Sequence, residues 1–320
     1  MHRLVGVGLL VALGLATPAA VAQPYPTRSI DLVVALAAGI GMDAVARLYA
    51  DRLSQALGKP VVVENKPGSA GLGAVETLLN APANGLTIGA ATSSIMAIRP
   101  SLFKTPPYDP LKDFVPISVY LKSPFILVVD PALPVHSVTE LIAYIKQRPG
   151  KISYSSSSIG GAPHLSAEYM RQRFGLDITH VPYRNSPQSI SDVAAGHVSM
   201  AFAEAGASLP LIKDGKLRAI AVTSLTRLPS LPDVPSFAEA TGNADFEMVS
   251  WHVLFAKAGT PDEIIERLYS ETTRILTDPK IQAAMTALGL IPQPPQSLAA
   301  TRAYIASEND KWSALVAGSI

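Results

Sequence analysis

The 320-residue chain contains no cysteine. Disulfide bonds and thiol chemistry are therefore excluded, and a zinc site would have to be built from histidine and carboxylate side chains. An excess of one charge is also missing, because 26 basic side chains stand against 25 acidic ones, with Arg3 close to the N-terminus. A neutral surface offers no general field that attracts nucleic acid or anionic lipid. Beyond the N-terminal segment, no apolar run approaches the roughly 20 residues that span a membrane.

The N-terminal segment has the pattern of an export signal. Arg3 gives a short basic start, residues 4–16 form an uncharged apolar run, and residues 20–22 form an A-x-A type cleavage site. The apolar run is too short for a transmembrane anchor. We therefore expect residues 1–22 to be a cleaved signal peptide. A cysteine-free exported product has to be stable through its hydrophobic core alone, and its length favours two domains.

Motifs of several enzyme classes are absent, including G-x-S-x-G, H-E-x-x-H and the P-loop. His164 and Glu168 are four residues apart and could face one side of a helix as metal ligands, but we expect His164 to cap or pack beside its loop. The serine run at 155–158 has no base near it in the sequence and is interpreted as a solvated or ligand-facing loop. We therefore predict no catalytic residues, no metal and no cofactor.

Runs rich in valine and isoleucine alternate with segments whose apolar residues recur at helical spacing, as at Val45, Leu48, Tyr49 and Leu53. This alternation predicts an α/β fold with an open, largely parallel sheet covered by helices on both faces. The strand candidates are residues 30–36, 60–65, 86–92, 125–131, 151–156, 177–183 and 217–224.

The strand–loop–helix pattern occurs twice, as "DLVVALAAGIGMDAVARL" from residue 31 and as "ISYSSSSIGGAPHLSAEYM" from residue 152. Each copy is followed by a second strand and a second turn into a helix, which indicates two similar lobes. Proline-rich connections at 105–116 and 229–235 bracket the second copy. We expect two segments to cross between the lobes, near 117–127 and 219–227.

These crossings set the expected boundaries. Lobe one comprises residues 23–122 and 227–320, and lobe two comprises residues 123–226. The C-terminal part is expected to be helical and to return to lobe one. Thr260 is a candidate N-cap for its first helix, with Pro261 at the first helical position and Glu263 at the third.

Turns rich in glycine, serine and alanine precede several expected helices. Unpaired backbone N–H groups and the helix dipole favour an anion at such positions, and small side chains allow it to approach. A carboxylate held in this way gains charge-assisted hydrogen bonds and needs no arginine. Strand-to-helix loops are rich in these residues in any α/β protein, so a single turn is weak evidence. The turns are residues 37–43, 66–73, 92–94, 155–164 and 183–189.

A nucleotide-binding alternative starts in the first of these turns. Gly39, Gly41 and Ala44 fit G-x-G-x-x-A after a strand, and Glu64 ends the next strand about where a ribose-binding acid lies. The pattern is short and degenerate. Export also argues against it, because a dissociable cofactor would have to be available outside the cytoplasm.

Over essentially its whole length the chain resembles the periplasmic solute receptors of tripartite tricarboxylate transporters, the Bug family. The resemblance rests on the order and spacing of several long motifs. They are "YPTRSIDLVVALAAGIGMDAVARLYADRLSQALGKPVVVENKPGSAG", "PSLFKTPPYDPLKDFVPIS", "GKISYSSSSIGGAPHLSAE", "HVPYRNS", "GKLRAIAVTS", "LPDVPSFAEA" and "SWHVLFAKAGTP".

The resemblance implies a type II periplasmic binding protein fold, with two lobes and two crossing hinge segments that close on a ligand like a Venus flytrap. It also implies a small carboxylate ligand held mainly by backbone amides of the loops. By position, the implied ligand-binding residues of lobe one are Ala38, Gly39, Ile40, Gly41, Asp43, Ser69, Ala70, Thr92 and Ser93. Those of lobe two are Ser157, Ser158, Gly160, Gly161, Ala162, Tyr183, Asn185, Ala203 and Glu204.

Several of these positions depart from the residues usual in the family. The first loop, commonly P-P-G-G-G-T-D, reads A-A-G-I-G-M-D here, and Gly161 and Ala162 replace a Thr-Ser pair. Ala203 replaces a common aspartate. Each change removes a polar side chain or adds an apolar one, so the backbone grip can persist while side-chain recognition changes. We therefore predict a monocarboxylate with an apolar or aromatic body as ligand, in preference to a hydrophilic dicarboxylate.

The resemblance further implies a periplasmic location and a membrane permease as partner. The protein is expected to be a monomer that does not bind nucleic acid. An orphan sensor that docks onto a signalling protein is the alternative within the receptor class, and an exported nucleotide-dependent enzyme is the alternative outside it.

Overall fold

The computed structural model describes residues 25–36, 38–39, 41–67, 71–157, 159–244 and 246–319. The expected signal peptide lies outside these ranges, as do Ile40, Ser69, Ala70 and Ser158 of the expected site. Among the described residues, no helix combines the length and the apolar character that crossing a membrane requires.

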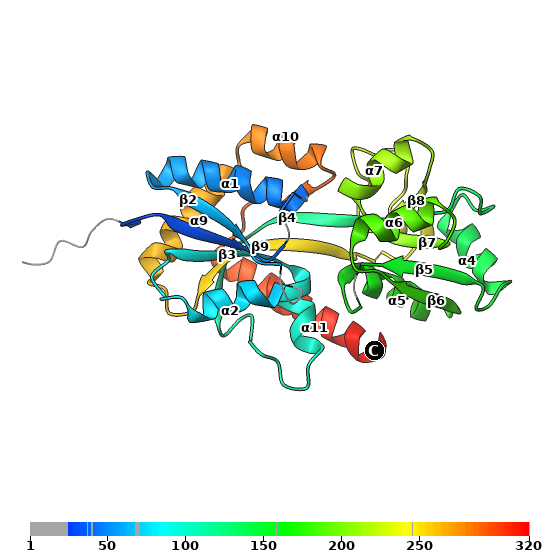
Figure 1. The fold of residues 1–320 in the computed structure, drawn as a ribbon, viewed down its shortest axis with the longest axis horizontal. Helices are drawn as coiled ribbons and strands as arrows, with labels where there is room; N and C mark the ends of the chain where they lie inside the picture. Colours follow the sequence, from blue (N-terminus) through cyan, green and yellow to red (C-terminus); the bar gives the residue numbers. More distant parts are fainter. Residues whose placement is uncertain are drawn as a thin grey trace, which may run out of the picture.

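The first half of the molecule is built on a parallel arrangement of β1 (Ile30–Val34), β2 (Val61–Asn65) and β3 (Thr87–Thr92), with β1 between the other two. On one face of this sheet, Leu32 packs in a cluster with the helix residues Leu53 and Leu268. On the other face, the helix residues Val75 and Ile95 pack in a second cluster. The helices of the first face are α1 (Gly41–Leu57), α9 (Asp262–Leu276) and α10 (Pro279–Ala287); those of the second are α2 (Leu72–Asn80) and η2 (Ser94–Ile98), which the short α3 (Arg99–Ser101) continues. Figure 1 shows α1 and α10 on the side of the sheet opposite α2.

The second half repeats this design. Its strands are β5 (Ile152–Ser156), β6 (Ile178–Pro182), β7 (Met200–Glu204) and β8 (Arg218–Val222), and β5 is parallel to both β6 and β7. Ile190 and Val193 pack on one face of this sheet, and Leu141 and Leu165 pack on the other. The helices are α6 (Ser186–Ala194) and α7 (Ala205–Lys213) on the first face, and α4 (Val138–Lys146), α5 (Ala162–Phe174) and α8 (Phe237–Thr241) on the second.

One long strand, β4 (Phe114–Val129), belongs to both halves. Up to Pro124 it pairs with β9 (Val249–Lys257), which itself pairs with β3. From Phe125 it pairs with β7 and β8 in the second half. The expected crossing near 117–127 therefore lies inside a continuous strand, which Figure 1 shows running between the halves. The short β10 (Ile291–Pro292) adds to its side at Leu121 and Lys122.

The second crossing differs from the expectation. The stretch 219–227 contains most of β8, which pairs with β4 inside the second half. The chain then remains there, because Ser236 bridges Val222 in parallel and α8 packs on α4. The return to the first half is made by β9, so the proline-rich stretch at 229–235 is a loop of the second half.

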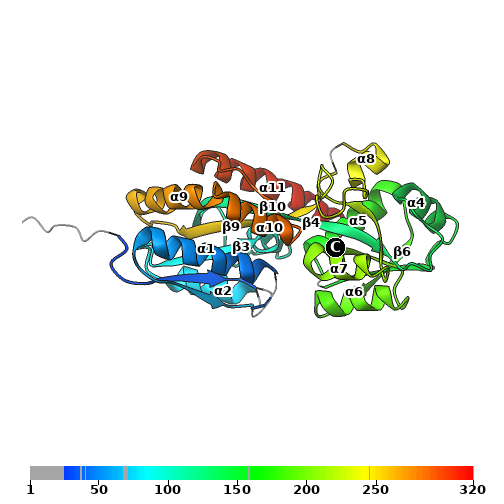
Figure 2. The same cartoon turned by 90° about the horizontal axis from the view of Figure 1, so that it is seen from above.

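The C-terminal helix α11 (Leu298–Ser319) lies along both halves (Figure 2). In the first half it packs on η2, and near its end Gln172 of α5 donates a 2.8 Å hydrogen bond to the Gly318 carbonyl. Between these contacts, the Glu308 carboxylate accepts hydrogen bonds from the indole N–H of Trp251 at 2.7 Å and of Trp312 at 3.0 Å. The helix is thus fastened to β9 at the crossing between the halves.

Local signals explain several helix starts. Ser137 caps α4 by accepting from the Glu140 N–H, and Ser236 and Glu239 form a capping box at α8. The expected cap of α9 was wrong by one residue. Pro261 occupies the N-cap position in an extended conformation, and the Thr260 hydroxyl donates to the Lys257 carbonyl instead.

Candidate functional site

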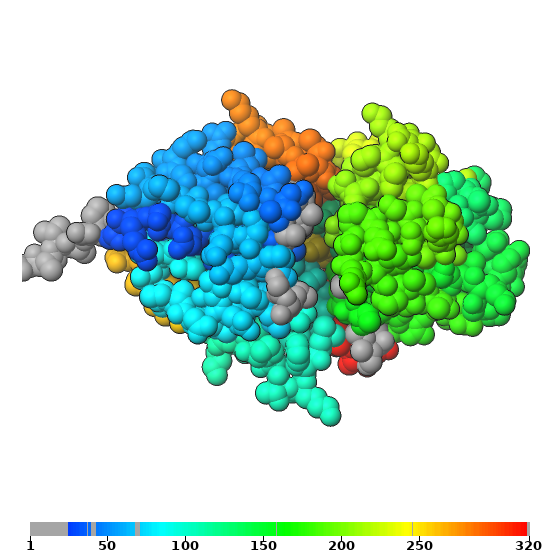
Figure 3. Space-filling model, in the orientation of Figure 1, coloured from blue at the N-terminus to red at the C-terminus, as the bar shows by residue number. Residues whose placement is uncertain are grey.

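The carboxyl ends of β1, β2 and β3 face those of β5, β6 and β7 across the middle of the molecule (Figure 1). The space-filling view shows a hollow between the half that carries α1 and α2 and the half that carries α5 and α6 (Figure 3). Ligands bind at the carboxyl ends of strands in open α/β sheets. The described members of the predicted site all lie in the segments that follow these strands or at their borders, and Ile40, Ser69, Ala70 and Ser158 lie outside the described residues. Contact of any of these residues with a ligand stays a prediction.

Asp43 organises the first loop. Its side chain is buried, and its carboxylate accepts hydrogen bonds from the Gly39 N–H at 3.0 Å, from Arg47 Nε at 3.0 Å and from Asn65 Nδ2 at 2.9 Å. Burial opposes the charge, but these three donors outweigh it and lower the pKa of Asp43. Asp43 is therefore a charged residue that holds the loop in place, with its oxygen atoms already occupied.

Asn65, at the end of β2, was missed by the sequence analysis. Its Nδ2 also donates to the Leu36 carbonyl at 3.0 Å, and its Oδ1 accepts from Arg47 at 2.9 Å. The side chain thus joins the end of β1 to the first turn of α1. The spacing of Asp43 and Arg47, one helical turn apart, could have indicated their pairing, but Asn65 carries no such local signal.

Ala38 and Gly39 are exposed at the tip of this loop, and Gly39 has a φ of 85°, which favours glycine. Gly41 begins α1. Because the Gly39 N–H is used by Asp43, it is not a free donor for a ligand in this conformation. The donors that remain at this position are those of the first turn of α1, which have no partner within the helix.

The third loop is more buried than a ligand-facing loop is expected to be. Thr92 ends β3 with 6% of its surface exposed, and Ser93 is fully buried. The Ser93 hydroxyl donates to the Ser250 hydroxyl on β9 at 3.3 Å. The predicted site residue Ser93 therefore contacts the crossing strand in this conformation.

The loop after β5 mirrors the loop after β1. The Gly160 N–H donates to Nδ1 of His164 at 3.0 Å, four residues on, as the Gly39 N–H does to Asp43. This confirms the expectation that His164 caps its loop. Gly160 has a φ of 73°, Gly161 is the N-cap of α5 without a side chain, and Ala162 is buried in its first turn. Ser157 is half-buried before the turn.

The rings of Tyr154, His180 and His164 form a stack beside this loop. The His164 and His180 rings lie 4.2 Å apart between centroids, and Tyr154 stacks on His180 at 4.8 Å. Burial lowers the pKa of both histidines, and that of His180 falls to about 4. The Glu168 carboxylate accepts from the Tyr154 hydroxyl at 2.6 Å. Among the described residues no group of side chains could hold a metal ion.

Tyr183 and Asn185 lie between β6 and α6. The Tyr183 hydroxyl donates to Asp192 at 2.6 Å, and burial together with this carboxylate raises the pKa of Tyr183 to about 12. Asn185 is the N-cap of α6 and accepts from the Gln188 N–H at 2.9 Å. Arg184 lies between them and is exposed, and the sequence analysis did not select it.

At the end of β7, Ala203 is buried and Glu204 is half-buried at the N-cap position of α7. Ile159, also absent from the prediction, is 64% exposed at the tip of the loop after β5. An exposed isoleucine among small residues adds apolar surface to the second half of the cleft.

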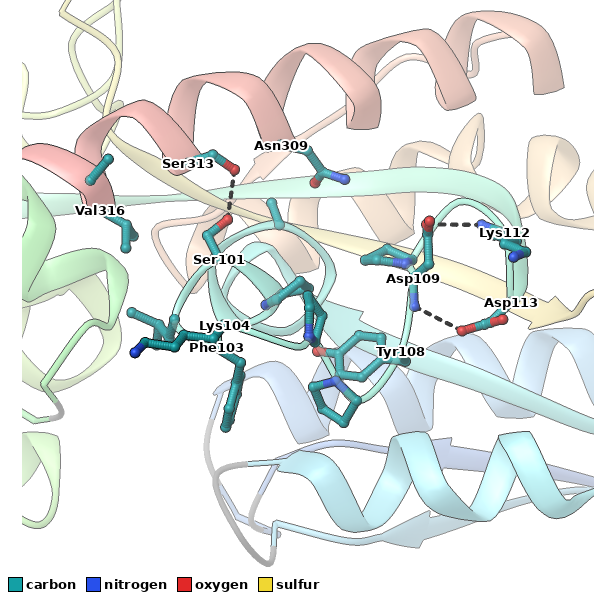
Figure 4. Close-up of a pocket in the computed structure, with 17 residues that line it drawn as sticks. Ser101, Phe103, Lys104, Tyr108, Asp109, Lys112, Asp113, Asn309, Ser313 and Val316 are labelled. Atoms are coloured by element: carbon teal, nitrogen blue, oxygen red, sulfur yellow. Dashed lines mark hydrogen bonds between the residues drawn. The ribbon is translucent and has the colours of Figure 1, made fainter.

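A different cavity, of about 970 Å³, lies between the segment 97–113 and α11 (Figure 4). The Ser101 and Ser313 hydroxyl groups are 2.6 Å apart across it, and Asp113 accepts from the Asp109 N–H on its other side. Of the predicted ligand-binding residues that the structure describes, none lines this cavity.

Comparison with known proteins identifies the chain. Residues 45–319 match the model of the tripartite tricarboxylate transporter family receptor. The chain is 34% identical to the protein BugT of Bordetella pertussis over 99% of this chain and 97% of that protein. A protein of R. palustris solved with adipate is similar at a TM-score of 0.81 and 34% identity, covering 91% of this chain and 97% of the other.

The periplasmic binding protein BugD superposes with a TM-score of 0.79 and 31% identity, covering 92% of this chain and 98% of BugD. The expected type II binding protein fold is thereby confirmed, and neither an enzyme nor a nucleotide-dependent protein is favoured. The chain belongs to the tripartite tricarboxylate transporter receptor family.

Proposed function

We propose that this receptor captures a small organic carboxylate in the cleft between its halves, within the periplasm, and presents it to membrane permease subunits. One observation carries the proposal: strand-to-helix loops of both halves, lined by small residues, converge on the same hollow (Figure 3). The similar protein solved with adipate supports a carboxylate as the class of ligand.

Helix N-termini supply the positive potential in this proposal. Helices α1, α5 and α6 each begin at the cleft, immediately after the loops that follow β1, β5 and β6. First-turn N–H groups lack a partner within a helix and carry the positive end of its dipole. Because Asp43 and His164 occupy the Gly39 and Gly160 N–H groups, the ligand is held by the amides that follow them.

Closure of the halves adds the second set of donors. We propose lobe one as residues 23–122 together with the chain from β9 onward, and lobe two as the segment between. Because α8 packs on α4, lobe two extends past residue 226 to the start of β9 at Val249. A micromolar ligand corresponds to about 8 kcal/mol, which a few charge-assisted hydrogen bonds and apolar burial can supply after ordering costs. The ligand favours closure through its extra contacts in the closed state.

Within the carboxylates, we propose a monocarboxylate with an apolar or aromatic body. The exposed Ile159 supports this preference because it offers apolar surface, and Gly161, Ala162 and Ala203 support it because they carry no polar side chain for a second carboxylate. The working protein is proposed to be a monomer released from its signal peptide, residues 1–22, with a permease as partner in preference to a signalling protein.

Calorimetric titration tests the function. The mature protein is titrated with benzoate, hexanoate, adipate, aspartate and citrate, and with NAD as a negative control. Benzoate or hexanoate is expected to bind most tightly. Tight binding of aspartate or citrate alone contradicts the monocarboxylate preference, and the absence of binding by every acid contradicts the carboxylate receptor itself.

Arg184 provides a sharper test of the backbone mechanism. If helix N-termini hold the carboxylate, Arg184→Ala weakens binding by no more than about threefold, or roughly 0.7 kcal/mol. The loss of a direct arginine–carboxylate pair would instead cost about 2 kcal/mol or more, about a thirtyfold weakening. A thirtyfold effect with an unchanged melting temperature would assign the carboxylate to Arg184.

A further inference from the structure

Glu204 is an acidic side chain at the cleft that the proposed backbone grip leaves without a role. It ends β7 and precedes α7. Its partner in the ladder is Phe125, the residue at which β4 begins to pair within the second half. The neighbouring Ala205 lies against the first half, since a Cβ built on Gly289 would come within 2.6 Å of the Ala205 Cβ. Glu204 therefore lies where the two halves meet.

The carboxyl of Glu204 has neither a hydrogen-bond donor nor a cation beside it among the described residues. Asp43, in the equivalent border of the first half, has three donors. Burial is the cause of the raised pKa of Glu204, whereas hydrogen bonds lower the pKa of Asp43. Asp43 thus favours the ionised form of its carboxyl group, and Glu204 favours the neutral form and accepts a proton more readily than an exposed glutamate does.

The elements packed on β7, and β8 beside β4, carry other titratable groups. Arg173 on α5 and Lys213 on α7 lie in the last turns of their helices, away from Glu204, and the others are engaged elsewhere. On α5, His164 accepts from Gly160 and Glu168 accepts from Tyr154. Lys122 on β4 donates to Glu247, and Asp192 on α6 accepts from Tyr183. Arg218 on β8 donates to backbone carbonyls at the far end of that strand. None of these groups is a partner of Glu204.

We propose that Glu204 takes up one proton from solvent when a carboxylate ligand enters the cleft, so that the receptor binds its ligand together with a proton. The inference rests on the proposed function. A second negative charge in a closing, water-poor cleft opposes the ionised form of Glu204. The neutral carboxyl then donates its O–H to an acceptor on the ligand, as an ionised carboxylate cannot.

This proton gives Glu204 a role in specificity. A carboxylate ligand whose other end bears a hydrogen-bond acceptor, such as a keto or hydroxyl oxygen, is favoured by the neutral acid. An amino acid places an ammonium group in the cleft. This positive charge favours the ionised form of Glu204, so no proton is taken up on binding. Glu204 is therefore expected to distinguish acids from amino acids by the protons that accompany binding.

Calorimetry in buffers of different ionisation enthalpy measures the protons taken up. The probe is the acid of the benzoate, hexanoate and adipate panel that binds the mature wild-type protein most tightly. With this probe, uptake is expected to approach about one proton per ligand, and the dissociation constant to rise up to about tenfold per pH unit across part of the range from about pH 5 to pH 8.

Two variants assign that proton. Glu204→Gln keeps the shape and an N–H donor but cannot titrate, so binding is expected to persist without proton uptake. Glu64→Gln is the matched control, because the Glu64 side chain is 51% exposed and pairs with Lys66 away from β7. It is expected to retain the wild-type proton uptake. Melting temperatures of both variants check that they fold.

The outcomes separate this inference from the function on which it rests. Tight binding by wild type without proton uptake overturns the role of Glu204 and leaves the carboxylate receptor intact. Equal proton uptake by wild type and Glu204→Gln also overturns it, because another group then takes the proton. If no acid of the panel binds wild type, both proposals fail.

Discussion

The backbone N–H of Gly160 donates a 3.0 Å hydrogen bond to Nδ1 of His164. A ring nitrogen that accepts a hydrogen bond carries no proton, so His164 is neutral with its proton on Nε2. Its ring lies 4.2 Å from that of His180, between centroids. A proton on Nδ1 of His164 would break the bond to the loop and bring a charge against the second imidazole. The shape of the cleft loop after β5 therefore depends on histidines that stay uncharged.

The pH dependence of stability follows from these histidines. Burial lowers the pKa of His180 to about 4 and that of His252 to about 3 in the folded protein. Unfolded histidine titrates near pH 6.5, so the unfolded state binds more protons between these values. The stabilisation is fully present above about pH 6.5, and the free energy of unfolding is expected to fall as the pH drops from there towards about 4.

Denaturant unfolding of His180→Asn across that pH range checks the assignment. The slope of unfolding free energy against pH is expected to be shallower than in wild type. His136→Asn is the control, because His136 is exposed, and its slope should match wild type. Parallel slopes for wild type and His180→Asn would contradict the assignment.

Replacing Asp43 by asparagine tests the organisation of the first loop. The change keeps the shape but removes the charge that accepts from Arg47 and Gly39. Unfolding free energy is expected to fall by about 2 kcal/mol, typical for hydrogen bonds to a charged group. Ligand binding should weaken as well, because the loop loses its position. Asp51→Asn, at an exposed site on the same helix, is expected to change neither.

Two glycines with similar backbone angles separate strain from packing. Gly39 and Gly71 have φ values of 85° and 90°. A Cβ on Gly39 meets nothing within 4 Å, whereas a Cβ on Gly71 would lie 2.2 Å from Ile95 Cδ1 and 3.1 Å from the Ala35 carbonyl oxygen. Gly39→Ala is expected to cost about 1 kcal/mol from the left-handed conformation alone.

For Gly71→Ala, the expected cost is about 3 kcal/mol, because overpacking adds to the same strain. Chemical denaturation of both variants measures the difference. Equal costs would mean that the loop before α2 moves freely to accept the methyl group.

Glu308 joins the C-terminal helix α11 to β9, and its removal should lower the free energy of unfolding. Glu308→Ala leaves the indole N–H groups of Trp251 and Trp312 without their buried acceptor. An unfolding free energy lower by about 3 kcal/mol is expected. Asp310→Ala, exposed on the same helix, is expected to be nearly neutral.

A double-mutant cycle with Trp251→Phe isolates the contact. In that background Glu308→Ala should cost less by about 1 kcal/mol, because one of the unpaired donors is already gone. Additive effects of the two substitutions would show that the hydrogen bond contributes nothing to stability.

Much of the fold could be predicted because central strands such as β1 and β5 are largely buried on both faces and appear as short apolar runs. The run 30–36 contains β1, and the run 151–156 contains β5. The first half of β4 lacked this signal, since Pro116, Ser118 and Lys122 interrupt it. The second crossing was misplaced because proline-rich composition does not show which strand a loop rejoins.

The sequence indicates which loops form the candidate site, but it does not indicate which contacts their residues make. Glycine next to a helix start marks where an anion can approach, and His164 could be assigned to its loop by proximity. The use of the Gly39 N–H by Asp43, and the burial of Ser93 against Ser250, depend on tertiary packing. Asn65 and Ile159 have no periodic or motif signal, so the structure alone reveals them.

Because β4 is one uninterrupted strand of 16 residues, neither half contains all of its own sheet. Cutting the chain near Pro124 would separate β9, in the C-terminal fragment, from both of its ladder partners, β3 and the first part of β4, in the N-terminal fragment. Separately expressed fragments are thus left with exposed ladder edges, which are prone to aggregation. The intact molecule should instead melt in a single cooperative transition.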